Sequence, residues 1–264
     1  MYAFDYARPP ELAGATTAHA GSDEAVYMAG GQTLIPTLKQ RLRRPSLVVD
    51  LGALSELKGI AVAGDVVTIG AMTTHADVAA SVDVRRAIPA LADLAQHIGD
   101  PQVRNRGTIG GSIANADPAA DYPAAILALG ATVHTATRSI AGDDFFTGMF
   151  ETALTPGELI VRVAFPVPKR AAYAKFRNPA SRYAIVGVMV AETASGIRVA
   201  VTGAGPSVFR VLAMEAALAK SFAPDAVRAI AIPAGDLNAD LHATAAYRAH
   251  LVAVMAARAV AAIA

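Results

Sequence analysis

Two glycine-rich segments have the residue types and spacing to bind an anion. Residues 30–34 (GGQTL) lie between a pattern typical of a strand and one typical of a helix, and residues 108–112 (TIGGS) carry a hydroxyl at each end. Because glycine has no Cβ, phosphate oxygens can approach such a backbone and accept hydrogen bonds from its amides. One glycine pair at a turn is common. Two loops could hold a diphosphate from opposite sides, which indicates a dinucleotide such as FAD or NAD.

A serine nucleophile is an alternative, because residues 110–114 (GGSIA) come within one residue of the G-x-S-x-G motif of hydrolases. That motif places its serine on a sharp turn that follows a buried strand. Ser112 instead follows the polar residues 104–107 (RNRG). Hydrolysis by Ser112 is therefore the less favoured alternative function.

A second motif resembles a dinucleotide-binding fingerprint. Residues 203–208 (GAGPSV) follow an expected strand and precede an expected helix. However, Pro206 removes an amide that would face the phosphates, and Val208 stands where the fingerprint needs Gly or Ala. We expect a structural turn here.

The composition excludes several classes of protein. The 264 residues include no cysteine, so this chain can hold no disulfide, thiolate zinc site or iron–sulfur cluster. The 23 basic and 22 acidic residues give no reason to expect nucleic acid as a partner. None of the six histidines is spaced to share a helical face with another, and no apolar run reaches the roughly 18 residues of a membrane span. We expect a cytoplasmic protein with no metal site and no membrane span.

The elements that must position the two loops follow from hydrophobic periodicity. Strands alternate with helices in the first half, which indicates an α/β or an α+β arrangement. In the second half strands precede helices, which indicates a small sheet covered on one face. A capping box of Thr74 with Asp77 is expected to open a helix. The other expected helices are 33–43, 84–98, 119–129, 209–220 and 242–263.

A domain boundary is expected near the alternate prolines Pro166 and Pro168, which interrupt strand pairing. The charge also changes there. Basic and acidic residues number 12 and 17 before Lys169, and 11 and 5 from Lys169 onward. We therefore divide the chain after residue 168.

The most specific motif of the chain is the stretch 104–123 (RNRGTIGGSIANADPAADYP). Further motifs are residues 29–36 (AGGQTLIP), 69–75 (IGAMTTH), 175–177 (KFR), 181–187 (SRYAIVG) and 246–248 (AYR). Together they resemble one family, the FAD-binding medium subunits of the molybdenum hydroxylases, which include carbon monoxide dehydrogenase flavoproteins and the flavin domain of xanthine dehydrogenase. The resemblance covers nearly the whole chain.

The resemblance implies a fold and a cofactor site. The fold would be α+β: two FAD-binding subdomains of the PCMH or vanillyl-alcohol-oxidase type (residues 1–55 and 56–168) would precede a C-terminal domain (169–264) made of a small antiparallel sheet packed with helices. Leu159 or Ile160, with Tyr183, would lie near the isoalloxazine, and Asp121 would bind a ribose or ribityl hydroxyl. The expected FAD-binding residues are Ala29, Gly30, Gly31, Gln32, Thr33, Leu34, Thr108, Ile109, Gly110, Gly111, Ser112, Asp121, Ile160, Lys175 and Tyr183.

The resemblance also implies a role in electron transfer. FAD would take electrons from the iron–sulfur clusters of a small partner subunit, which receives them from a large molybdopterin subunit, and would pass them to NAD or another acceptor. The assembly would be a dimer of heterotrimers. No side chain of this chain need act as a catalytic residue, because the cofactor supplies the redox chemistry. A non-catalytic nucleotide-binding or scaffolding subunit is the other alternative.

Overall fold

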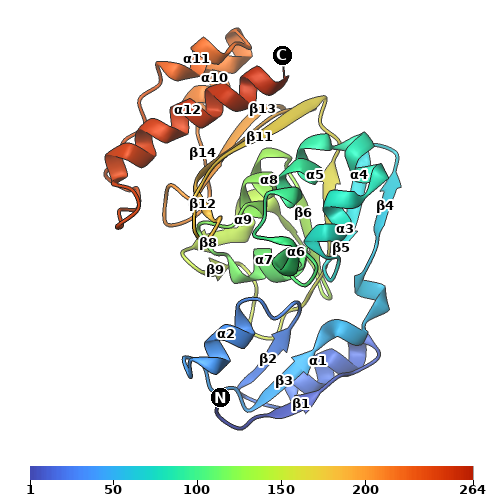
Figure 1. Cartoon of the computed structure of the whole chain (residues 1–264). Coiled ribbons are helices and arrows are strands. Elements are labelled where there is room, and N and C mark those ends of the chain that lie inside the picture. Colours follow the sequence, from blue (N-terminus) through green and yellow to red (C-terminus); the bar gives the residue numbers. More distant parts are fainter. Residues whose placement is uncertain (264) are drawn as a thin grey trace.

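Three larger β-sheets follow one another along the chain in this computed structural model, which describes residues 1–263, and the short strands β8 and β9 form a fourth sheet (Figure 1). The N-terminal sheet has the order β1-β3-β2, and both of its strand pairs are parallel. Parallel strands that follow one another in sequence need crossover connections. Helix α1 supplies one between β1 and β2, and α2 supplies one between β2 and β3. The bounds are β1 Asp5–Ala7, α1 Leu12–Ala20, β2 Ala25–Met28, α2 Leu34–Lys39 and β3 Leu47–Asp50.

Helix α2 is shorter than the predicted helix 33–43. It ends at Lys39, and Arg41 takes the left-handed backbone conformation, with φ +60°. The Leu42 amide then donates to the Thr37 carbonyl, which folds the following turn back onto the helix. The apolar spacing at Leu34, Leu38 and Leu42 therefore continues beyond the helix itself.

The central sheet is antiparallel, with the order β4-β5-β10-β6-β7. Strand β10 comes last in sequence but lies in the middle, so it closes this part of the molecule around one apolar core. Strands β4 and β5 form a hairpin around Gly64. The strands are β4 Ile60–Ala63, β5 Val66–Gly70, β6 Thr132–Thr135, β7 Ser139–Ala141 and β10 Ile160–Pro166.

Helices cover the central sheet (Figure 1). The capping box is confirmed: the Asp77 amide donates to the Thr74 hydroxyl, and the Asp77 carboxylate accepts from the Thr74 amide. The single predicted helix 84–98 is wrong, because Pro89 forces Ile88 out of the helical region and starts a new helix. The helices are α3 His75–Ala80, α4 Val82–Ala87, α5 Pro89–Gln96, α6 Pro101–Arg104, α7 Ile109–Asn115 and α8 Tyr122–Ala128.

Short elements connect these larger ones. They are the 3₁₀ turns Leu51–Ala53 and Ser55–Leu57, the helix α9 Gly142–Phe145, and the strands β8 Phe146–Gly148 and β9 Glu151–Thr152.

The C-terminal sheet is antiparallel, in the order β11-β12-β13-β14. Strand β12 reads as a continuous apolar run because both of its faces are buried. Val186, Val188 and Val190 contact the C-terminal core, whereas Met189 and Ala191 contact the central core. The bounds are β11 Arg170–Arg177, β12 Ala184–Thr193, β13 Gly196–Thr202, β14 Phe209–Arg210, α10 Leu212–Lys220, α11 Pro224–Arg228 and α12 Ala245–Ile263.

Helix α12 is, within residues 1–263, the one helix long and apolar enough by composition to cross a membrane. It lies along β11 and β12 (Figure 1), and 44% of its most apolar window is buried there. The core helix of a globular domain has the same composition, so this feature is explained by packing. The predicted α+β fold, ending in a small antiparallel sheet packed with helices, is confirmed. The residue boundaries of the three domains stay a prediction.

Candidate functional site

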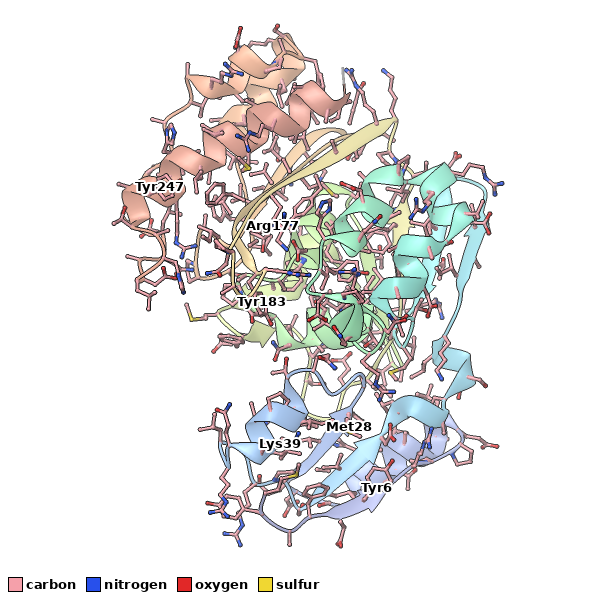
Figure 2. The ribbon with its side chains drawn as sticks, viewed as in Figure 1. Tyr6, Met28, Lys39, Arg177, Tyr183 and Tyr247 are labelled. Carbon is pink, nitrogen blue, oxygen red and sulfur yellow. The ribbon has the colours of Figure 1, made fainter. Side chains whose placement is uncertain are left out.

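A cavity of about 810 Å³ lies at the junction of the N-terminal and central sheets, and the loop between β11 and β12 closes one side of it. In Figure 2, Met28 and Lys39 lie in the lower part of the molecule, beneath this junction, and Tyr183 lies above. Most of the predicted site residues line the cavity. These are Ala29, Gly30, Gly31, Gln32, Thr33, Leu34, Thr108, Gly110, Gly111, Ser112, Asp121, Ile160 and Tyr183, and Leu159 lines it too.

The two glycine-rich loops meet at this cavity. A Cβ built on Gly30 would lie 2.1 Å from the carbonyl oxygen of Arg106, so only glycine allows the contact between the loops. A Cβ built on Gly111 would lie 3.3 Å from the Cβ of Ala29. Segments almost eighty residues apart in sequence therefore form one continuous wall without side chains, as the phosphates of a dinucleotide require.

The first loop, residues 29–34, has free hydrogen-bond donors. Gly31 takes φ +74°, and its carbonyl accepts the Ile35 amide at the start of α2. Within residues 1–263, the amides of Gly31, Gln32 and Thr33 donate to no acceptor. Gln32 and Thr33 are also exposed. These donors suit an anion in the cavity.

The second loop works differently from the prediction. The Ile109 and Gly110 amides donate to the carbonyls of Thr73 and Ala71, at 3.1 and 2.9 Å. The Gly111 amide donates to the Thr108 hydroxyl, which caps α7. The expectation that a run of free amides faces an anion here is therefore wrong, because two of the amides bond to the residues that follow β5 and the third is taken by the cap of α7. Ile109 is fully buried and does not line the cavity.

Asp121 lines the cavity at the start of α8 and belongs to a buried cluster. It accepts hydrogen bonds from the Tyr173 hydroxyl at 2.5 Å and from Lys175 Nζ at 2.9 Å, and the same Nζ donates to the carbonyl of His97. Burial raises the pKa of Asp121, and the Lys175 charge opposes that rise. Lys175 itself does not line the cavity. The Lys175 ammonium therefore contacts Asp121 and not the cavity.

Glu158 is a cavity residue that sequence reasoning missed. Arg138 binds its carboxylate through two hydrogen bonds of 2.8 Å, and Thr135 and the Thr155 amide add two more. These bonds, led by those from Arg138, lower the pKa of Glu158 far below its usual range. The cluster holds the segment that carries Leu159 and Ile160. Residues twenty positions apart gave no signal of this contact.

Tyr183 stands at the mouth of the cavity with 48% of its surface exposed. The Asn178 side chain accepts the amides of Ala180 and Ser181, and Arg182 takes φ +64°, so the loop that carries Tyr183 is held in a defined shape. Burial raises the pKa of Tyr183, and nearby carboxylates add to the rise. A neutral, half-covered phenol can cover a flat ring while its hydroxyl stays in water.

The two alternative motifs have structural roles. The Ser112 hydroxyl makes no hydrogen bond with a histidine anywhere in the described part of the chain, and Ser112 lies inside α7 and not on a strand-to-helix turn. Gly203 takes φ +81° and approaches the carbonyl of Ala184, and its own carbonyl accepts Arg248. The GAGPSV segment is therefore the predicted turn.

His75 is a second cavity residue that the motifs did not identify as functional. It is 4% exposed, its ring lies 5.4 Å from the Tyr122 ring at an angle of 47°, and its Nδ1 has no hydrogen-bond partner within residues 1–263. Burial, reinforced by the Arg104 charge, lowers the pKa of His75 to about 4. The imidazole is therefore neutral in the folded protein near pH 7.

This pKa predicts how stability depends on pH. Below about pH 6.5 the unfolded chain binds a proton at His75, whereas the folded chain does not until about pH 4, so stability falls with pH in this window. We expect a loss of about 3 kcal/mol from this residue. In His75→Phe the loss between pH 7 and pH 4.5 should be smaller, as measured by urea unfolding. Equal losses in both proteins would contradict the assignment.

The family pattern described as the FAD-binding domain in molybdopterin dehydrogenase matches residues 2–168. The nicotine 6-hydroxylase medium subunit of Paenarthrobacter nicotinovorans is 36% identical over 265 residues, which cover 95% of this chain and 93% of that protein. The carbon monoxide dehydrogenase medium chain of Hydrogenophaga pseudoflava is 37% identical over 259 residues, which cover 90% of each chain.

Solved structures have the same fold over the whole chain. Quinoline 2-oxidoreductase from Pseudomonas putida 86 matches with a TM-score of 0.90 at 30% identity, covering 99% of this chain and 97% of that chain. Carbon monoxide dehydrogenase from Hydrogenophaga pseudoflava matches with a TM-score of 0.89 at 34% identity and the same coverage. The glycine wall and free amides of the cavity fit the dinucleotide that the family binds. The chain therefore belongs to the FAD-binding medium subunits of the molybdopterin dehydrogenases, with FAD as its cofactor and a role as a flavin-dependent oxidoreductase subunit.

Proposed function

We propose that FAD lies in the 810 Å³ cavity and carries electrons from the iron–sulfur clusters of a small partner subunit to NAD or another acceptor. The observation that carries this proposal is the meeting of the two predicted loops in one cavity. The diphosphate is assigned to the free amides of residues 31–33, beside the bare surface of Gly111. The isoalloxazine is assigned to the wall formed by Leu159, Ile160 and Tyr183.

Bound FAD supplies the redox chemistry, because it can accept and release two electrons. The chain supplies binding, orientation and protection from water. Leu159 and Ile160 are buried, so they offer an apolar wall, while the half-exposed Tyr183 covers the mouth. Asp121, held by Tyr173 and Lys175, offers a fixed acceptor for a hydroxyl of the cofactor. Gln32 and Ser112 can complete the polar contacts.

A second cavity supports a place for the electron acceptor. It has a volume of about 280 Å³ and shares Asp117, Phe150, Ser181 and Tyr183 with the first. An acceptor that approached from this side would be separated from the FAD cavity by Tyr183 and Phe150. We assign the exit of electrons to this side of the chain.

The proposed partners follow from the relatives. The nicotine 6-hydroxylase and carbon monoxide dehydrogenase chains are named as medium subunits, so each belongs to an assembly with other subunits. We propose the same for this chain, with a small iron–sulfur subunit and a large molybdopterin subunit in a dimer of heterotrimers. The substrate would be chosen at the molybdenum, outside this chain.

The test is whether the purified chain binds FAD and which flavin it prefers. After incubation with FAD and removal of free ligand, we expect a yellow protein with a band at roughly 450 nm that bleaches on reduction. Chromatography of the denatured supernatant should identify FAD. A chain that stays colourless would support a scaffolding subunit instead. Esterase activity lost in Ser112→Ala, without a change in bound flavin, would support the hydrolase.

A further inference from the structure

Arg43 lies between Arg41 and Arg44 in the sequence but contacts a different part of the molecule. The guanidinium groups of Arg41 and Arg44 lie over the Tyr2 ring, at 5.7 and 5.3 Å from its centroid. Arg43 lines the large cavity. Within residues 1–263 it has no ion pair, side-chain hydrogen bond or aromatic partner. An arginine kept free at a cavity wall has its full donor capacity available to a ligand.

Two of the three carboxylates that line the cavity are paired with cations that do not line it, Asp121 with Lys175 and Glu158 with Arg138. The third, Asp117, accepts the Ala119 amide and has no ion pair among residues 1–263. The one other arginine among the described lining residues, Arg182, belongs to the Tyr183 loop and donates to the carbonyl of Gly99. Arg43 is therefore the uncommitted cation at the N-terminal wall.

The free amides and Arg43 lie at opposite ends of one short helix-and-turn unit. Residues 31–33 precede α2 and Arg43 follows it, and the hydrogen bond from the Leu42 amide to the Thr37 carbonyl folds the turn back toward the helix. Both ends of this short helix-and-turn unit line the cavity. A charged fork and a set of amides on one rigid unit can act on the same anion.

We propose that Arg43 is a binding residue for the diphosphate of FAD and completes the anion site that the amides of residues 31–33 begin. The inference rests on the proposed placement of FAD in this cavity. The diphosphate carries two negative charges, and the guanidinium can donate two parallel hydrogen bonds to phosphate oxygens. Arg43 thereby makes FAD binding sensitive to salt, because part of the affinity is a charge pair near solvent.

The test compares Arg43→Gln with Arg44→Gln in the full chain, stripped of flavin and titrated with FAD by fluorescence quenching. We expect Arg43→Gln to weaken FAD binding about tenfold at about 50 mM NaCl, which is the loss of one charged hydrogen-bonding partner. The difference from wild type should shrink at about 400 mM NaCl. Arg44→Gln should bind like wild type, and Arg43→Lys should recover part of the affinity.

Each outcome decides one question. A wild-type chain that is folded and binds no FAD contradicts the proposed function. A wild-type chain that binds FAD, together with an Arg43→Gln variant of equal affinity, overturns the role of Arg43 alone. A weakening that is equal in Arg43→Gln and Arg44→Gln, or that does not change with salt, would also overturn it, because a general loss of structure or charge would explain it.

Discussion

Gly111→Val is expected to lower FAD affinity by at least about 100-fold, which corresponds to the strain of overpacking a fitted site. A Cβ at position 111 would lie 3.0 Å from the Thr108 hydroxyl and 3.3 Å from the Ala29 Cβ. The two further carbons of valine would then fill cavity space beside the first loop or push that loop away. Either result removes the bare wall against which the diphosphate is assigned.

The fold should survive this change. Gly111 is partly exposed and lies in α7 with an ordinary backbone conformation, so valine strains no dihedral. We expect the free energy of unfolding in urea to change by no more than about 2 kcal/mol. Isothermal titration or fluorescence quenching would give the FAD affinity.

Gly235→Val is the matched control. A Cβ at Gly235 would meet nothing within 4 Å, and this residue lies far along the chain from either loop. The control should bind FAD as the wild type does. A folded Gly111→Val chain with normal FAD affinity would place the diphosphate elsewhere.

The two loops could be predicted from the sequence because their function depends on backbone. A glycine pair between a strand and a helix is visible in the residues themselves, and so is the capping box at Thr74 and Asp77. The position of the loop at 108–112 beside the cavity was predicted correctly, but the hydrogen-bond partners of its amides were not. Its amides bond to Thr73 and Ala71, and only tertiary structure decides which acceptor an amide finds.

The charged groups of the cavity were harder to predict. Glu158 and Arg138 are twenty residues apart, and Asp121 is more than fifty residues from Lys175, so neither pair has a sequence pattern. The resemblance of residues 175–177 to the family placed Lys175 among the expected FAD-binding residues. The structure turns that side chain into the interior, where it meets Asp121 and the His97 carbonyl.

The separation into three sheets explains why the site lies where it does. The continuous apolar run of β12 is buried on both faces, so the C-terminal sheet is fixed against the central core. The Tyr183 loop that precedes β12 is therefore held over the cavity. The N-terminal sheet contributes the opposite wall through the first loop. The cavity is thus built from three parts that no single local motif could specify.

The second large prediction concerns the buried ion pair between Lys175 and Asp121 at the cavity wall. Lys175→Met should lower the free energy of unfolding by about 3–5 kcal/mol at pH 7, because it leaves the Asp121 carboxylate buried without its cation. The two side chains are 3% and 4% exposed, so water cannot replace the lost partner. Lys169→Met is the matched control. Its partner is Glu192, Lys169 is 75% exposed, and its loss should change stability by less than about 1 kcal/mol.

The loss of stability in Lys175→Met should grow as the pH rises. Burial already raises the pKa of Asp121, and the Lys175 charge is the largest effect that lowers it. Without Lys175, the pKa of Asp121 in the folded variant rises further. The folded variant therefore keeps a proton on Asp121 at pH values above about 4, where the unfolded chain has released it. Stability of the variant relative to wild type should therefore fall as the pH rises from 4.5 to 7. Adding Asp121→Asn to Lys175→Met should remove this pH dependence. Urea unfolding at pH 4.5 and at pH 7 measures this dependence. If Lys175→Met lost no more stability than Lys169→Met, the prediction that Lys175 and Asp121 form a stabilising buried ion pair would be wrong.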